Sequence, residues 1–192
     1  MAVRRIVVTG GPGGGKTSVW RAFMQSHAHH VEGVPEVATA LLTTVFPPVR
    51  SVHERHALQR AIFHVQRELE SAHEQRCGAG RALFCDRGTP DGAGYWPEGD
   101  AAFFASMNTR AEDELARYDA VLFLETAAAA GLSIAAGNPI RTESLEAAVE
   151  VDRRLRAVWS GHPGFVHVGW EVDFQQKLAR ALGALAGMLT GR

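Results

Sequence analysis

The chain has 192 residues, of which 46% are hydrophobic and 21% are charged, and its formal net charge is −1. This length and composition predict a single globular domain over residues 1–192, and the near-neutral charge argues against nucleic acid as a partner. No stretch approaches the ~20 consecutive apolar residues that cross a membrane, and Cys77 and Cys85 are expected to be free thiols, so we expect no membrane partner and a cytoplasmic location.

Short apolar runs alternate with helical patterns along the chain. Strands are predicted at residues 4–8, 31–34, 82–85, 120–124 and 165–168. Helices are predicted at 52–76, from about 109, at about 142–160 and after 173. The predicted inward stripe of the first helix consists of Leu58, Ile62, Val65, Leu69 and Ala72. The alternation predicts an α/β fold whose parallel sheet is covered by helices on both faces and binds ligands at the carboxyl ends of its strands.

A glycine-rich segment directly follows the first predicted strand. It reads Gly10-Gly11-Pro12-Gly13-Gly14-Gly15-Lys16-Thr17-Ser18 and fits the pattern G-x-x-x-x-G-K-[ST] without a mismatch. A strand, a glycine loop and a helix N-terminus in this order form a phosphate site. Lys16 can reach the β- and γ-phosphates with a compact ammonium, and Thr17 is expected to place its hydroxyl on Mg²⁺. The segment predicts binding of ATP, with GTP also possible, together with Mg²⁺.

The third predicted strand runs into Asp86, which is followed by Arg87. An aspartate at the carboxyl end of a strand can hold the Mg²⁺ shell or orient the hydroxyl of an acceptor. An arginine beside it can grip an anionic group of the acceptor in two-pronged fashion. The alternative is an ordinary turn at a strand end, but a phosphate loop in the same chain favours the functional interpretation.

Two further residues are expected near this edge of the sheet. Glu36 follows the second predicted strand and is expected either to act as general base on an acceptor hydroxyl or to stabilise the first turn of a short helix. Residues 88–99 are predicted to form a loop with exposed aromatic side chains. Within it, Tyr95 is expected either to bind the acceptor by ring stacking or to pack on the surface.

Residues 126–160 are interpreted as a lid. A stretch rich in glycine and alanine, 127–137, precedes Arg141, which is expected to reach the transferring phosphoryl group when the lid closes. The helix predicted at about 142–160 follows Arg141 and contains Arg153 and Arg154. Which of the three arginines faces the phosphates is left open. The alternative is that they pair with nearby glutamates on a solvated helix face.

Together and in this order, these segments resemble a family of single-domain P-loop proteins that is classed with AAA-type ATPases but is more similar to small-molecule kinases. The family is related to the ribosylnicotinamide kinase domain of a bifunctional regulator of NAD synthesis, and to nucleoside and thymidylate kinases. The matching stretches are 9–17, 34–36, 85–91, 138–141 and 173–177. The resemblance implies a P-loop NTPase fold of three α/β/α layers with five parallel strands in the kinase-like order 2-3-1-4-5, and it implies that Arg87 engages the acceptor.

We therefore predict a Mg²⁺-dependent kinase that transfers the γ-phosphate of ATP to a small-molecule acceptor such as a nucleoside, a nucleotide or a related metabolite. Its predicted catalytic residues are Lys16, Glu36, Asp86 and Arg141. The alternative is a switch that hydrolyses ATP or GTP, or a nucleotide sensor, acting through a protein partner. A switch needs the phosphate loop but leaves Glu36 and Arg87 without a task.

Overall fold

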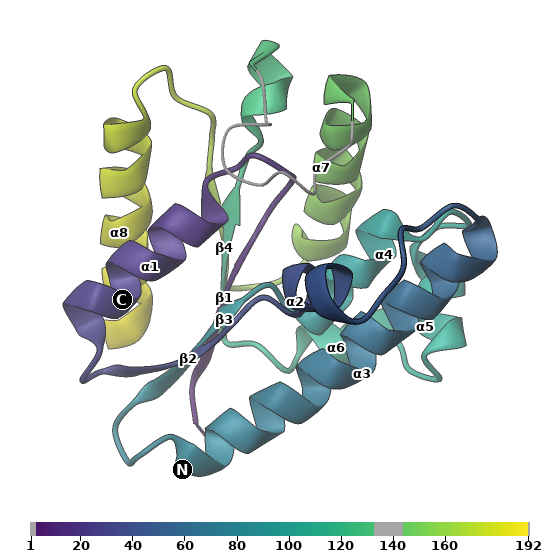
Figure 1. Ribbon diagram of the computed structural model, residues 1–192. Helices are drawn as coiled ribbons and strands as arrows, with labels where there is room; N and C mark the ends of the chain where they lie inside the picture. The colour runs from purple at the N-terminus through teal and green to yellow at the C-terminus, as the bar shows by residue number, and fades with distance from the viewer. Residues whose placement is uncertain (1–2, 133–143, 192) are drawn as a thin grey trace.

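The structure, a computed structural model, describes residues 3–132 and 144–191. Within these residues five parallel strands form one sheet in the order β2-β3-β1-β4-β5 (Figure 1), which confirms the predicted fold class and strand order. The strands are β1 (Arg5–Thr9), β2 (Val31–Val34), β3 (Ala82–Asp86), β4 (Ala120–Leu124) and β5 (Phe165–Val168). Each observed strand begins and ends within one residue of its prediction, because buried parallel strands are continuous apolar runs bounded by polar residues or glycine.

Helices cover both faces of the sheet (Figure 1). On one face α1 (Lys16–His27) packs beside α8 (Phe174–Thr190). The other face is covered by α3 (Val52–Arg76) and α7 (Leu145–Trp159). Within the described ranges, four shorter helices lie in the connections: α2 (Val37–Thr44), α4 (Gly92–Tyr95), α5 (Asp100–Ser106) and α6 (Ala111–Leu115).

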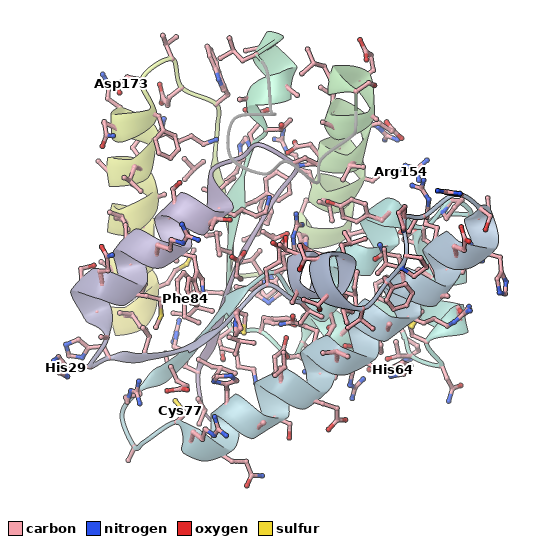
Figure 2. The ribbon with its side chains drawn as sticks, viewed as in Figure 1. His29, His64, Cys77, Phe84, Arg154 and Asp173 are labelled. Carbon is pink, nitrogen blue, oxygen red and sulfur yellow. The ribbon has the colours of Figure 1, made fainter. Side chains whose placement is uncertain are left out.

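The two faces of the sheet carry separate halves of the core. Ile6 and Val8 of β1 lie with Phe84 of β3 in the half beneath α1 and α8 (Figure 2). Val7, between them in sequence, lies in the other half with Trp159 of α7. This separation follows from the two-residue period of a strand, which points successive side chains to opposite faces.

The inward face of α3 differs from the prediction. Val65, predicted to point inward, is 38% exposed, and the helix instead buries Gln59, Phe63, Gln66 and Glu70 together with Leu58. The Glu70 carboxylate accepts hydrogen bonds from Gln66 Nε2 at 3.0 Å and from the Tyr118 hydroxyl at 2.7 Å. Polar side chains with partners elsewhere in the chain therefore occupy positions that an apolar stripe alone cannot predict.

The prediction of a loop over residues 88–99 is wrong for its first half. There a 3-10 helix (Thr89–Asp91) is followed directly by α4. Trp96, expected to be exposed, is only 3% exposed. Its ring packs against Phe103 of α5 and stacks on His56 of α3, with ring centroids 5.6 Å and 4.0 Å away. Burial of this large aromatic surface outweighs the preference of a segment rich in glycine and proline for irregular structure.

The segment interpreted as a lid is described in two parts. Residues 126–132 contain a 3-10 helix (Ala127–Ala130), and α7 begins after Ser144, whose hydroxyl caps it by accepting from Ala147 N. Arg141 lies outside the described residues.

Cys77 and Cys85 are both free thiols, as expected. No helix within 3–132 or 144–191 has the length and apolar character needed to cross a membrane.

Candidate functional site

The glycine-rich loop connects the end of β1 to the start of α1 at the carboxyl edge of the sheet. Gly10 has φ 132°, and a Cβ at this position would lie 2.1 Å from the carbonyl oxygen of Leu124, at the end of β4. Only glycine fits such a close approach. The loop is followed by α1. The first N–H groups of a helix have no partner within it and favour a negatively charged ligand.

Lys16 folds back over this loop. Its side chain is buried, with 4% of the residue exposed, and Nζ donates hydrogen bonds to the carbonyl oxygens of Gly10 at 2.8 Å and Gly11 at 2.6 Å. Thr17 and Ser18, the next residues of α1, are exposed. The ammonium is therefore held where phosphates would meet the loop, and the Thr17 hydroxyl is open to a metal ion.

Asp86 ends β3 beside β1, where its Cα is paired with that of Val8. The residue is 4% exposed, and its Oδ1 atom is buried with no hydrogen-bond partner in the part of the chain that the structure describes. Burial, reinforced by the negative charge of Glu36, raises the pKa of Asp86 to about 6, against the opposing effect of Arg87 and Lys16. An unpartnered buried carboxylate oxygen is costly, and such atoms mark places where a ligand donates.

Arg87 is held between two carboxylates. Its Nε donates to Glu36 Oε1 at 2.7 Å and its Nη1 to Asp91 Oδ2 at 3.0 Å, while its Cζ lies 5.8 Å from the ring centroid of Tyr95. The backbone of Arg87 has φ 73°, a conformation that a non-glycine residue rarely adopts. Its N–H donates to the Val8 carbonyl at 2.9 Å, which holds this turn against β1.

Glu36 is the N-cap residue of α2, but its side chain forms no cap hydrogen bond with the helix backbone. Besides the bond from Arg87, its Oε2 accepts from the Thr39 hydroxyl at 2.7 Å. Burial raises the pKa of Glu36, but Arg87, the Thr39 hydroxyl and Lys16 together outweigh burial and lower it to about 2. The structure thus brings together Glu36, Asp86, Arg87 and Tyr95, with Lys16 close enough to act on the charges of both carboxylates.

Asp91 is a site residue to which the sequence assigned no role. Its carboxylate accepts from the Thr9 hydroxyl at 2.8 Å and from Trp159 Nε1 at 2.7 Å, in addition to Arg87. Thr9 ends β1 and Trp159 ends α7, so Asp91 joins three distant segments around the Arg87 guanidinium. Its position five residues after Asp86 in a matching stretch was the only signal available from the sequence.

Asp152 of α7 is a second unpredicted residue. Its Oδ1 accepts from Gly11 N at 2.8 Å and from Thr126 N at 3.0 Å, and the Thr126 hydroxyl donates to the Pro12 carbonyl. The helix within the segment interpreted as a lid is therefore tied directly to the glycine-rich loop. This contact positions the loop, because two backbone N–H groups from different segments share one carboxylate oxygen.

Arg153 and Arg154 lie on the side of α7 that pairs with Glu150. Arg153 binds Glu150 through two hydrogen bonds at 2.8 Å with 68% of its side chain exposed. Arg154, on the outer side of α7 in Figure 2, donates to Glu150 Oε1 at 2.8 Å and to the carbonyl of Trp96 at 3.2 Å. Both arginines therefore show the surface pairing that was the alternative to a role on the phosphates.

Gly11→Ala should disrupt the contact between the loop and α7. A Cβ at residue 11 would lie 2.5 Å from Asp152 Oδ1 and 2.6 Å from Asp152 Cβ. Relieving this overlap requires α7 or the loop to move, so we expect a loss of about 1–3 kcal/mol in unfolding free energy and weaker ATP binding. Chemical denaturation and calorimetric titration with a non-hydrolysable ATP analogue measure the two effects.

Gly183→Ala is the matched control for Gly11→Ala. Gly183 lies in α8, where an added Cβ meets no described atom within 4 Å. This substitution should raise the unfolding free energy by about 0.5–1 kcal/mol, because alanine favours the helix. Equal stability of Gly11→Ala and the unmodified protein would contradict the close packing of Asp152 on the loop.

The described residues fit a nucleotide-bound Mg²⁺ ion. Among residues 3–132 and 144–191, no three His, Cys, Asp or Glu side chains converge on a common metal position. Mg²⁺ in phosphate sites does not need such a cage, since it is held by one or two protein oxygens together with phosphate oxygens and water. The exposed Thr17 hydroxyl and one oxygen of the Asp86 carboxylate are groups of this kind.

Comparison with known proteins places this geometry in a family. A family model described as "AAA domain" matches residues 5–177. The match begins in β1 and extends into α8, and it includes the glycine-rich loop, Asp86 and Arg87. A search of curated proteins returns no match to the chain.

Proposed function

From the premise that the chain belongs to the AAA-domain family of nucleotide-binding P-loop NTPases, we propose that it is a kinase. In this proposal it transfers the γ-phosphate of ATP to a hydroxyl group of a small-molecule acceptor. ATP occupies the loop of residues 10–18, and the acceptor lies beside Asp86. The observation that carries the proposal is the buried Asp86 Oδ1 without a partner, because a hydrogen-bond donor from a bound molecule satisfies it.

The loop residues act on the phosphates. Lys16 exchanges the carbonyls of Gly10 and Gly11 for oxygens of the β- and γ-phosphates, and the N–H groups at the start of α1 face the same oxygens. Thr17 and one Asp86 oxygen would hold Mg²⁺, which would supply positive charge to the phosphates. Catalysis at such a site consists mainly of positioning and charge stabilisation.

Asp86 acts on the acceptor. The acceptor oxygen forms a bond to the γ-phosphorus while the bond between that phosphorus and the bridging oxygen breaks, and ADP leaves with the electron pair. The hydroxyl proton passes to a carboxylate. Asp86 has a buried oxygen without a hydrogen-bond partner among the described residues, whereas both Glu36 oxygens already accept from Arg87 and Thr39. Burial also raises the pKa of Asp86, which favours its carboxylate as the proton acceptor. We therefore assign proton transfer to Asp86, and assign to Glu36 the positioning of Arg87.

The test is release of ADP or GDP from the corresponding triphosphate with Mg²⁺, in the presence and absence of a mixed pool of nucleosides, nucleotides, pyridine ribosides and sugars. A kinase releases diphosphate faster with the pool, and labelled γ-phosphate appears on an acceptor. Release that is slow and indifferent to every pool would contradict the proposal. It would favour the hydrolysing switch or the nucleotide sensor.

A further inference from the structure

We infer that the acceptor carries no phosphate and is an uncharged or cationic hydroxyl compound, because the only cation beside Asp86 on the described acceptor side is already bound by two carboxylates of the protein. This inference rests on the proposed kinase function. It narrows the range of candidate acceptors: nucleosides and other unphosphorylated compounds remain, and nucleotides are excluded.

The described acceptor side carries more negative than positive charge. Three carboxylates, from Glu36, Asp86 and Asp91, surround the single guanidinium of Arg87. The side chains of Arg87, Glu36 and Asp91 are 11%, 18% and 6% exposed, so water screens their charges only weakly. A phosphorylated acceptor would bring two further negative charges into this group.

Arg87 is already engaged by two carboxylates of the protein. Its Nε and Nη1 donate one N–H group each to Glu36 and Asp91. A phosphate that took Nε as one of two adjacent donors would displace Glu36. A phosphate that bound the other N–H groups would share the positive charge of the guanidinium with two buried carboxylates. Asp91 is further fixed by Thr9 and Trp159, and the carbonyl of Arg87 accepts from Gln66 Nε2 at 3.3 Å. The guanidinium and its partners are therefore held as one unit.

Lys16 does not offset the excess negative charge of the acceptor side, because in the proposed function its ammonium binds the phosphates of ATP. The acceptor then meets Asp86 Oδ1, a buried atom that accepts hydrogen bonds when the carboxyl is ionised. A hydroxyl or an ammonium group can donate to it, whereas an ionised phosphate cannot and would face like charge. The same side chains thus attract a donor and disfavour an anion.

The experiment compares matched pairs of acceptors in a γ-phosphate transfer assay. Ribonucleosides, a pyridinium riboside, free sugars and amino sugars are each measured beside their own monophosphates. We expect transfer to at least one unphosphorylated member, with kcat/KM about tenfold or more above that of its monophosphate, since like charges in an interface are strongly disfavoured. Equal or better transfer to a monophosphate would overturn the inference while leaving the kinase intact. Transfer to no acceptor would instead overturn the proposed function, and the inference with it.

A binding measurement tests the charge argument without catalysis. The protein is loaded with a non-hydrolysable ATP analogue and Mg²⁺, and uridine monophosphate is titrated by calorimetry. Glu36→Gln removes one negative charge and frees Arg87, so it should bind the monophosphate about tenfold or more tightly than the unmodified protein does. Glu68→Gln removes the same charge from an exposed position of α3 and should leave binding unchanged. Equally weak binding by Glu36→Gln and Glu68→Gln would overturn the inference.

Discussion

Lys16→Ala should weaken ATP binding by roughly 10- to 100-fold, because a hydrogen bond from a charged donor contributes about 1.5–3 kcal/mol. Turnover at saturating ATP should fall by a further factor of about 10²–10³, since charge that develops on the phosphoryl group loses its nearest cation. The fold should survive, because the hydrogen bonds that Lys16 Nζ donates to the Gly10 and Gly11 carbonyls lie within its own loop. Calorimetric titration and single-turnover kinetics measure the two losses separately.

Two further variants separate the charge of Lys16 from its shape. Lys16→Arg keeps the charge but should be nearly as impaired as alanine, because the side chain is enclosed by the loop and a planar guanidinium is larger. Arg153→Ala removes a cation from the exposed side of α7 and should bind and turn over ATP normally. Full activity of Lys16→Ala would contradict the role of the loop, and an impaired Arg153→Ala would show that α7 contributes a cation after all.

The strands and the glycine-rich loop could be predicted because their signals are local. A buried parallel strand is a short apolar run, and the loop is defined by residues that are consecutive in sequence. The polar inward face of α3 could not be predicted in this way. Glu70 is buried because Tyr118 and Gln66 donate to it, and Tyr118 lies 48 residues away in the sequence. Periodicity identifies a helix, but it cannot identify which polar side chains will find distant partners.

The same distinction holds in the site. Glu36 and Asp86 were expected together because both follow predicted strands of one parallel sheet, and the carboxyl ends of such strands share an edge. Asp152 was not expected, since it lies in the middle of α7 and binds Gly11 from 141 residues away. The pairing of Arg87 with both Glu36 and Asp91 was also beyond the sequence, and the engagement of an acceptor by Arg87 stays a prediction.

Asp86→Asn should lower phosphate transfer by about 10²–10⁴, the usual contribution of a positioned proton acceptor. ATP affinity should change little, because the loop and Lys16 remain.

The same substitution should raise the free energy of unfolding although it lowers phosphate transfer. The pKa of Asp86 is raised to about 6 in the folded protein, so the ionised carboxylate destabilises the fold above that pH. Without nucleotide or metal at pH 7.5, Asp86→Asn should therefore unfold with a free energy about 1–3 kcal/mol higher than the unmodified protein.

The opposite signs of the two effects distinguish a functional Asp86 from a structural one. If the carboxylate were structural, its replacement would lower both the free energy of unfolding and the activity. A carboxylate kept for chemistry destabilises the folded protein, so its replacement raises the free energy of unfolding. The stability gain should disappear below about pH 4, where the carboxyl is protonated in both the folded and the unfolded chain. Glu112→Gln, an exposed carboxylate at the start of α6, controls for the loss of one charge and should change neither quantity by much. Retained phosphate transfer in Asp86→Asn would refute its assigned role, because the proton would then have to pass to another group.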